Sequence, residues 1–146
     1  MSLLELKYKQ EILIEKVKYE VLSITKFREK SSYWIEYSLR RLDDYKIVYL
    51  NVELSSKAIL YEILENATID LNMNIIFQGN SYELYEKGTG IVESYYGITD
   101  VRLYEEVSYY EYQSKRNNKI FLSVEKWYDE TEISLGRMLR QSAIKY

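Results

Sequence analysis

Apolar and polar residues alternate along most of this chain with the two-residue period of a β-strand that is buried on one face. From residue 33 to residue 40 the odd positions are apolar and the even positions are mostly polar. Asp43 and Asp44 follow as a turn signal, and residues 47–53 then repeat the alternation. Two such runs separated by a short polar turn predict an antiparallel hairpin.

A second hairpin is predicted in the C-terminal half of the chain. Residues 107–112 and 120–127 alternate in the same way on either side of the polar stretch 115–118. Between the two hairpins, Gly88 and Gly90 interrupt another apolar–polar pattern, and we expect them to form a turn or a bulge between two further strands. Their surroundings lack the lysine and the following helix of a phosphate-binding loop.

Short helices are compatible with only a few stretches. Ser2–Glu5 fits the capping box that begins a helix, so a short N-terminal helix is expected. Residues 55–65 and 135–142 are ambiguous, and each is compatible with one or two helical turns.

The two predicted hairpins belong to a longer internal similarity. Residues 16–53 and 78–125 carry similar short motifs in the same order, for example Glu36–Tyr37 and Glu111–Tyr112. A duplicated β-meander would explain this order, and chance similarity among common strand residues is the alternative. We therefore predict one domain over residues 1–146, all-β and mainly antiparallel. Two similar β-meander lobes would form a sandwich or a pair of small barrels, with at most short helices.

The composition excludes several kinds of chemistry. The 146 residues include no cysteine and no histidine, which excludes disulfides, zinc–thiolate sites and Ser-His-Asp catalysis. The acidic stretch 129–132 lacks the spacing of a calcium-binding loop. We therefore expect no cofactor and no metal ion. Tyrosine is abundant, with 17 residues, and suits both strands and interfaces.

Charge and hydropathy restrict the partners. The net charge is −3 and neither half of the chain is basic, so no nucleic acid is expected as a partner. The basic tip at 115–119 is too small to change this expectation. No apolar run is long enough for a membrane span, and the N-terminus lacks the features of a signal peptide. With cysteine absent as well, we expect a cytoplasmic protein. The sequence leaves the oligomeric state open.

The strand period sorts the side chains of both hairpins onto two faces. One face is apolar, and it includes Leu50 and Leu122. The other face carries aromatic rings and glutamates, and it is either the solvated face of a half-buried sheet or a site that binds a cation or a sugar. The candidate binding residues on this face are Trp34, Glu36, Glu53, Tyr109, Glu111, Phe121, Glu125 and Trp127.

Several of these motifs resemble a known family. Trp34–Leu39 is similar to the W-x-E-Y-x-L core of the bacterial domain of unknown function 4178 family. Tyr82–Tyr85 resembles the middle section of that family, and Leu122–Trp127 resembles its end. The likeness covers roughly residues 16–144, although the chain lacks the usual glycines of the early hairpins. The resemblance implies a compact β domain and no activity, because none is assigned to the family.

Two functions from different classes follow from these residues. The leading hypothesis is a non-enzymatic binding or scaffold module that docks a protein partner through aromatic side chains. The alternative is a carboxylate-based hydrolase of a sugar-like substrate, in which Glu111 and Glu125 act as paired acid and base. Phe121 and Trp127 are expected to desolvate Glu125 and to raise its pKa.

Overall fold

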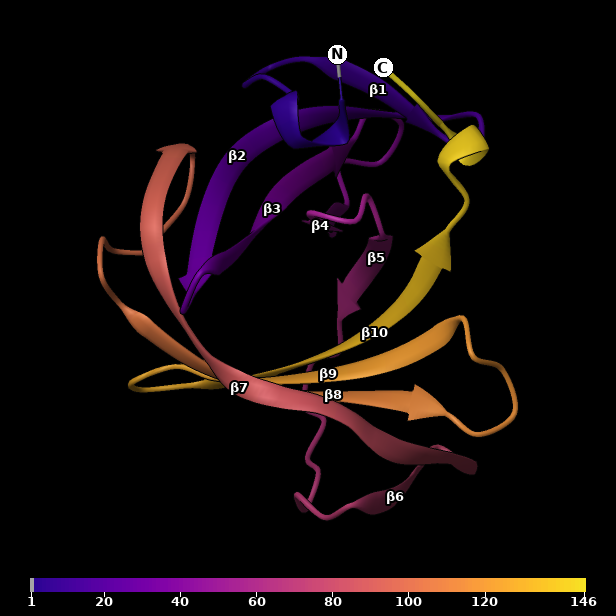
Figure 1. The fold of residues 1–146 in the computed structure, drawn as a ribbon. Coiled ribbons are helices and arrows are strands. Elements are labelled where there is room, and N and C mark those ends of the chain that lie inside the picture. Colours follow the sequence, from indigo (N-terminus) through magenta and orange to yellow (C-terminus); the bar gives the residue numbers. More distant parts are fainter. Residues whose placement is uncertain (1) are drawn as a thin grey trace.

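The computed structural model describes residues 2–146, and nearly all of them lie in or between antiparallel β-strands (Figure 1). The prediction of an all-β, antiparallel fold is therefore confirmed. None of the helices in residues 2–146 is long and apolar enough to cross a membrane. The elements are η1 (Leu3–Glu5), β1 (Glu11–Ile14), β2 (Val17–Glu29), β3 (Ser32–Arg41), β4 (Ile47–Glu53), β5 (Ala58–Ile63), β6 (Asn74–Phe77), β7 (Asn80–Gly97), β8 (Glu106–Ser114), β9 (Ile120–Lys126), β10 (Thr131–Leu139), η2 (Gln141–Ala143) and β11 (Ile144–Lys145).

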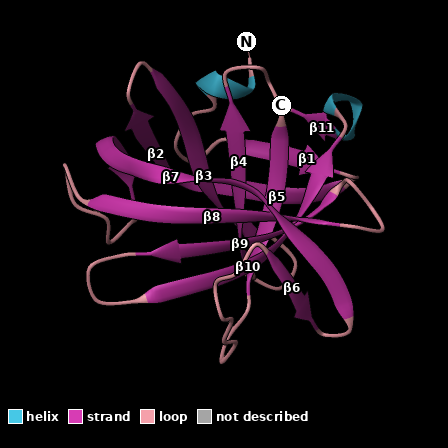
Figure 2. Ribbon diagram, turned by 60° about the horizontal axis from the view of Figure 1, so that its bottom comes forward, coloured by secondary structure: helices cyan, strands magenta, loops and turns pink. Residues whose placement is uncertain are grey.

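Eight strands close into one barrel, in the order β2-β3-β4-β5-β10-β9-β8-β7 (Figures 1 and 2). The closing contact is an antiparallel pairing of β2 with β7 over Ser23–Arg28. The first residues of β2, Val17–Glu20, pair instead with β1, which extends the sheet beyond the barrel. The expected sandwich or pair of small barrels is therefore wrong. Closure into a single barrel leaves the eight strands without an exposed edge.

The barrel consists of two four-stranded meanders, β2 to β5 and β7 to β10. The first and the last strands of one meander lie beside the corresponding strands of the other, because β2 pairs with β7 and β5 pairs with β10. Residues 64–79, which include β6, connect the two meanders. This strand order is compatible with the suggested duplication of 16–53 and 78–125. Strand order alone does not establish that the two halves have the same shape. The duplication stays a prediction.

The apolar face of the predicted hairpins is the outer face of the barrel, covered by further segments of the chain. Leu39, Leu50 and Val52 are completely buried there, in a cluster that also includes residues of η1, β1 and β11. Tyr37 belongs to the same cluster, and its hydroxyl donates to the carbonyl of Leu3 at 2.6 Å.

The second meander has a similar outer cluster. Leu122 and Val124 are buried under the segment that connects β5 to β7, which contributes Ile69 and Leu71. The hydroxyl of Tyr112 donates to the carbonyl of Asn72 at 2.9 Å. Each meander therefore holds a covering segment against its outer face with a tyrosine hydroxyl.

The local predictions had mixed outcomes. The short N-terminal helix is confirmed as the 3-10 helix η1, whose first turn is capped by the Ser2 hydroxyl. The helical turns considered for 55–65 and 135–142 are wrong, apart from η2, since these stretches form β5 and most of β10. Ala58–Tyr61 is buried on both faces, so the sequence lacks the alternation that would have identified a strand.

Candidate functional site

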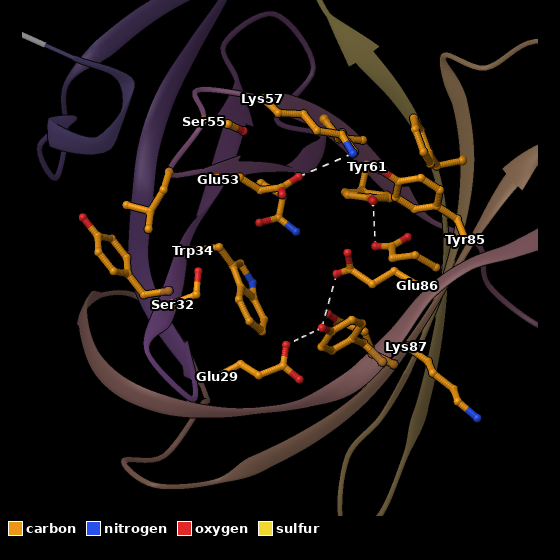
Figure 3. Close-up of a pocket in the computed structure, with 18 of the residues that line it drawn as sticks. Glu29, Ser32, Trp34, Glu53, Ser55, Lys57, Tyr61, Tyr85, Glu86 and Lys87 are labelled. Carbon is orange, nitrogen blue, oxygen red and sulfur yellow. Dashed lines mark hydrogen bonds and ion pairs between the residues drawn. The ribbon is translucent and has the colours of Figure 1, made fainter.

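The face that carries glutamates and aromatic rings is the inner face of the barrel. It surrounds a cavity of about 620 Å³ that lies at the barrel end with the β2–β3 turn and the β4–β5 loop (Figure 3). The interpretation as a solvated sheet face is therefore wrong, because closure turns this face inward. Six of the eight predicted binding residues line the cavity, namely Trp34, Glu53, Tyr109, Glu111, Phe121 and Glu125.

The remaining two predicted residues lie elsewhere in the barrel. Glu36 is opposite Asn51 in the β3–β4 register, and it is half-buried deeper in the interior. Trp127 packs on Phe27 with ring centroids 6.1 Å apart, outside the residues that line the cavity. Trp127 thus contributes to the packing of the barrel interior.

Strand register determines how the lining side chains meet. Trp34 on β3 is directly opposite Glu53 on β4, and Tyr109 on β8 is directly opposite Glu125 on β9. Each pair therefore places a ring beside a carboxyl group. Glu125 is also directly opposite Glu132 on β10. Two carboxylates at this position repel each other, since directly opposite side chains in antiparallel strands are close neighbours.

Gly88 and Gly90 lie within the continuous strand β7, so the turn or strand break expected at this position is wrong. Both glycines make room for side chains inside the barrel. A Cβ at Gly90 would lie 2.5 Å from Cη2 of Trp34, and a Cβ at Gly88 would lie 2.7 Å from the hydroxyl of Tyr109. Glycine at these positions lets large rings lie against the strand backbone.

Replacing Gly90 with alanine is expected to destabilise the protein by roughly 1–3 kcal/mol, because the added methyl group overlaps the ring of Trp34. The ring has little room to retreat, since it is stacked on Phe27 with centroids 5.1 Å apart and 11° between the planes. Urea unfolding measures the loss, with Thr89→Ala at the neighbouring exposed position as the control. Equal stability of the two variants would show that Trp34 is not confined by Gly90.

A β-bulge and a loop lysine complete the cavity wall. The register of β7 with β8 shifts between Leu84 and Glu86, and the intervening Tyr85 contacts Phe121 edge-on with centroids 6.0 Å apart. Lys57, just before β5, lies over both rings, with its Nζ 4.9 Å from the centroid of Tyr85 and 5.1 Å from that of Phe121. Its Nζ is also 3.5 Å from Oε2 of Glu53.

Tyrosine hydroxyls bind several of the carboxyl groups (Figure 3). Tyr61 on β5 donates to Oε1 of Glu111 at 2.8 Å. Tyr109 donates to Oε1 of Glu29 at 2.5 Å, and its hydroxyl is 3.3 Å from Oε1 of Glu86. Burial and these carboxylate contacts raise the pKa of Tyr109. The hydroxyls therefore stay protonated at neutral pH and act as donors.

The interior carboxyl groups favour their protonated forms. Burial, together with the charge of Glu125, raises the pKa of Glu111 to about 8, although the hydrogen bond from Tyr61 opposes the shift. Burial and repulsion by Glu132 raise the pKa of Glu125, and burial and repulsion by Glu125 raise that of Glu36. The pKa of Glu125 is thus raised as expected, with Glu132 as a cause that the sequence did not indicate. Trp127, which was expected to raise this pKa, instead lowers it through a hydrogen bond to the carboxylate.

Two buried polar atoms on the cavity wall lack a hydrogen-bond partner in the described part of the chain: Oδ1 of Asn51 and Oε2 of Glu111. The sequence reasoning did not single out Asn51, Lys57 or Tyr61 as functional residues. Strand parity places Asn51 on the candidate face together with Glu53, although Asn51 was not among the candidate binding residues. Lys57 and Tyr61 fell in a stretch that was ambiguous between helix and strand.

Acidic side chains in the described part of the chain do not form a metal site. No group of three or more acidic side chains within residues 2–146 is placed to hold a metal ion. The acidic stretch at 129–132 is exposed except for Glu132, which is half-buried.

The fold and the site together define an antiparallel β-barrel protein with an aromatic, carboxyl-lined interior cavity. The chain belongs to the family described as Domain of unknown function (DUF4178), whose model matches residues 10–141. The resemblance noted in the sequence is therefore confirmed over nearly the whole chain. Searches of curated proteins and of solved structures gave no match.

Proposed function

We propose that the protein binds a small organic ligand inside its barrel. The observation that carries this proposal is the cavity of about 620 Å³, bounded by aromatic rings and by carboxyl groups on rigid strands. Small-molecule sites typically measure roughly 300–1,000 Å³ and combine apolar walls with a few polar groups that orient the ligand. Antiparallel barrels of eight strands are wide enough to hold one small ligand.

The polarity of the barrel interior supports the same proposal. An interior filled with apolar side chains would be more stable than one that holds carboxyl groups with raised pKa values. Each buried polar atom without a partner, such as Oδ1 of Asn51 or Oε2 of Glu111, costs about 1–3 kcal/mol. Unfavourable polar groups that converge on a cavity are typical of binding and catalytic sites, where the ligand supplies the missing interactions.

A pair of tyrosine substitutions tests whether the cavity is the binding site. Ile59 lines the cavity, so Ile59→Tyr should fill part of it, whereas Ile76→Tyr makes the same change on the exposed side of β6. Ligand-observed NMR with a mixture of aromatic amines, alcohols and carboxylates is expected to detect binding to the wild type and to Ile76→Tyr, but not to Ile59→Tyr. Near-ultraviolet circular dichroism checks that both variants are folded. Absence of binding to the wild type, or unchanged binding to Ile59→Tyr, would contradict the proposal.

A protein partner is a second candidate, now on different residues. The aromatic residues chosen from the sequence to anchor an interface lie inside the barrel. However, large apolar side chains are exposed at the end of β7 and in the loop that follows, which is typical of an interface. They are Tyr95, Tyr96, Ile98, Leu103 and Tyr104. The expected cytoplasmic location stays a prediction.

The hydrolase alternative is favoured by one observation, which is that Glu111 and Glu125 line the same cavity. The pKa of each is raised, so both suit the role of an acid, and neither is held as the anion that a base or nucleophile must be. We therefore rank hydrolysis below ligand binding as a function of this cavity. Turnover of glycosides or esters by the wild type that Glu111→Gln and Glu125→Gln both abolish would reverse the order.

A further inference from the structure

We propose that the ligand is an organic cation, whose ammonium group pairs with the carboxyl groups inside the barrel and whose apolar part contacts Trp34. This inference rests on the proposed function, because it names the class of ligand that the same cavity takes. It is carried by three features of the cavity: its charge, the position of Lys57, and the packing of Trp34.

Acidic side chains outnumber basic ones on the cavity wall. Five glutamates line it, whereas the cations on the wall are three lysines. Lys30 is exposed at the turn, and Lys87 points away from the cavity (Figure 3). Lys57 is therefore the cation that reaches the inner wall. An ammonium group would favour the ionised forms of Glu111 and Glu125, which burial disfavours, whereas an anionic ligand would disfavour them further. The five glutamates are Glu29, Glu53, Glu86, Glu111 and Glu125.

Lys57 shows how the wall accommodates an ammonium group. Its Nζ lies 3.5 Å from Oε2 of Glu53 and over the faces of Tyr85 and Phe121, at 4.9 and 5.1 Å from the ring centroids. A carboxylate and aromatic faces together are the environment that favours a partly desolvated ammonium ion. The chain itself thus fills one such position, on the wall of the cavity.

A second position of the same kind has carboxyl groups but no cation from the chain. Glu111 and Glu125 line the cavity on β8 and β9, and no lysine or arginine contributes to the pKa shift of either. Oε2 of Glu111 is buried without a hydrogen-bond partner within 3.5 Å, although the hydroxyl of Ser123, directly opposite on β9, is near enough to lower the pKa of Glu111. An ammonium group would donate to this oxygen and offset the repulsion between the two carboxylates. A neutral sugar would supply donors but would leave the repulsion in place.

Trp34 provides a preorganised surface for the apolar part of the ligand. Its ring is stacked on Phe27 and meets Tyr109 edge-on, with centroids 5.6 Å apart and 76° between the planes. A ring held on two sides loses little freedom when a ligand packs against it, and this favours affinity. Figure 3 shows Trp34 facing the interior between Glu53 and Glu29.

Three probes of similar size test the charge preference. Phenethylamine, phenethyl alcohol and 3-phenylpropionate share a ring and differ in the charge of the polar end. They are titrated near pH 8 into the wild type, and isothermal titration calorimetry measures the affinity of each. We expect the amine to bind at least ~10-fold more tightly than the alcohol, and the carboxylate to bind most weakly.

Variants of the carboxyl groups test the position of the ammonium ion. Glu111→Gln is expected to weaken binding of the amine by ~10-fold and to leave binding of the alcohol nearly unchanged, with Glu125→Gln as an independent second variant. Glu83→Gln, at an exposed position of β7, is the matched control. Unchanged amine binding in both cavity variants would overturn the inference.

The outcomes separate this inference from the proposed function. If the alcohol or the carboxylate binds as tightly as the amine, the ligand class is wrong and binding in the cavity stands. If none of the three probes binds while the fragment mixture does, the inference fails alone. If the fragment mixture fails to bind as well, both the inference and the proposed function are wrong.

Discussion

At alkaline pH, Glu111→Gln is expected to be more stable than the wild type, by about 2–4 kcal/mol in the free energy of unfolding. The pKa of Glu111 is raised from 4.5 to about 8 in the folded protein, because burial and the charge of Glu125 disfavour its ionised form. An acid with a higher pKa in the folded state binds protons on folding, so stability falls as pH rises between the unfolded and the folded pKa. Glutamine keeps an oxygen that accepts the hydrogen bond from Tyr61.

The pH dependence identifies the cause of this gain. The difference between Glu111→Gln and the wild type should be small below pH 4.5, grow between pH 4.5 and 8, and level off above pH 8. Urea unfolding across this range measures it, with Glu83→Gln as the control at an exposed position. If the difference in stability does not change with pH, or if Glu111→Gln is less stable than the wild type at pH 9, then ionisation of Glu111 does not destabilise the native barrel. The same variant should bind an amine more weakly, so stability and ligand binding oppose each other at Glu111.

The second large effect is expected outside the barrel, at Tyr37. Tyr37→Ala should cost about 3–5 kcal/mol, because a completely buried ring is removed from the outer cluster. Tyr37→Phe should cost about 1–3 kcal/mol, since it leaves backbone groups of the N-terminal segment without a partner. These groups are the carbonyl of Leu3, 2.6 Å from the Tyr37 hydroxyl, and the N–H of Leu6, 3.3 Å from it.

Urea unfolding measures both losses, and amide hydrogen exchange at Leu6 reports whether η1 detaches. Tyr128→Phe is the control, because Tyr128 is 97% exposed and its hydroxyl can bond to water. The interpretation fails if Tyr37→Phe is no less stable than Tyr128→Phe, or if exchange at Leu6 is unchanged.

Much of the candidate site could be predicted from strand parity. Side chains two residues apart lie on the same face of a strand, so Trp34 and Glu36 were grouped correctly, as were Glu111 and Tyr109. Which face is enclosed could not be predicted from parity, because it depends on the direction in which the sheet curves. Apolar residues on the other face suggested that this was the core side. They are indeed buried, but under covering segments on the outer surface of the barrel.

The positions of the bulges also could not be predicted from the sequence pattern. A register shift between Val21 and Ser23 changes which residues of β2 face the interior, and the shift next to Leu84 accompanies the contact of Tyr85 with Phe121 at the cavity. A bulge inserts one residue and therefore reverses the alternation beyond it. Its position depends on the partner strand, which a local pattern does not contain.

The sequence by itself determined that the chain forms antiparallel strands, which side chains share a face, and which kinds of catalysis its composition excludes. These are local properties of period and residue type. Only the tertiary structure decided that β2 pairs with β7, that one barrel forms, and that the glutamates and aromatic rings meet around a cavity. Pairing between distant strands depends on the packing of the whole chain, and closure of the sheet turns one of two otherwise equivalent faces inward.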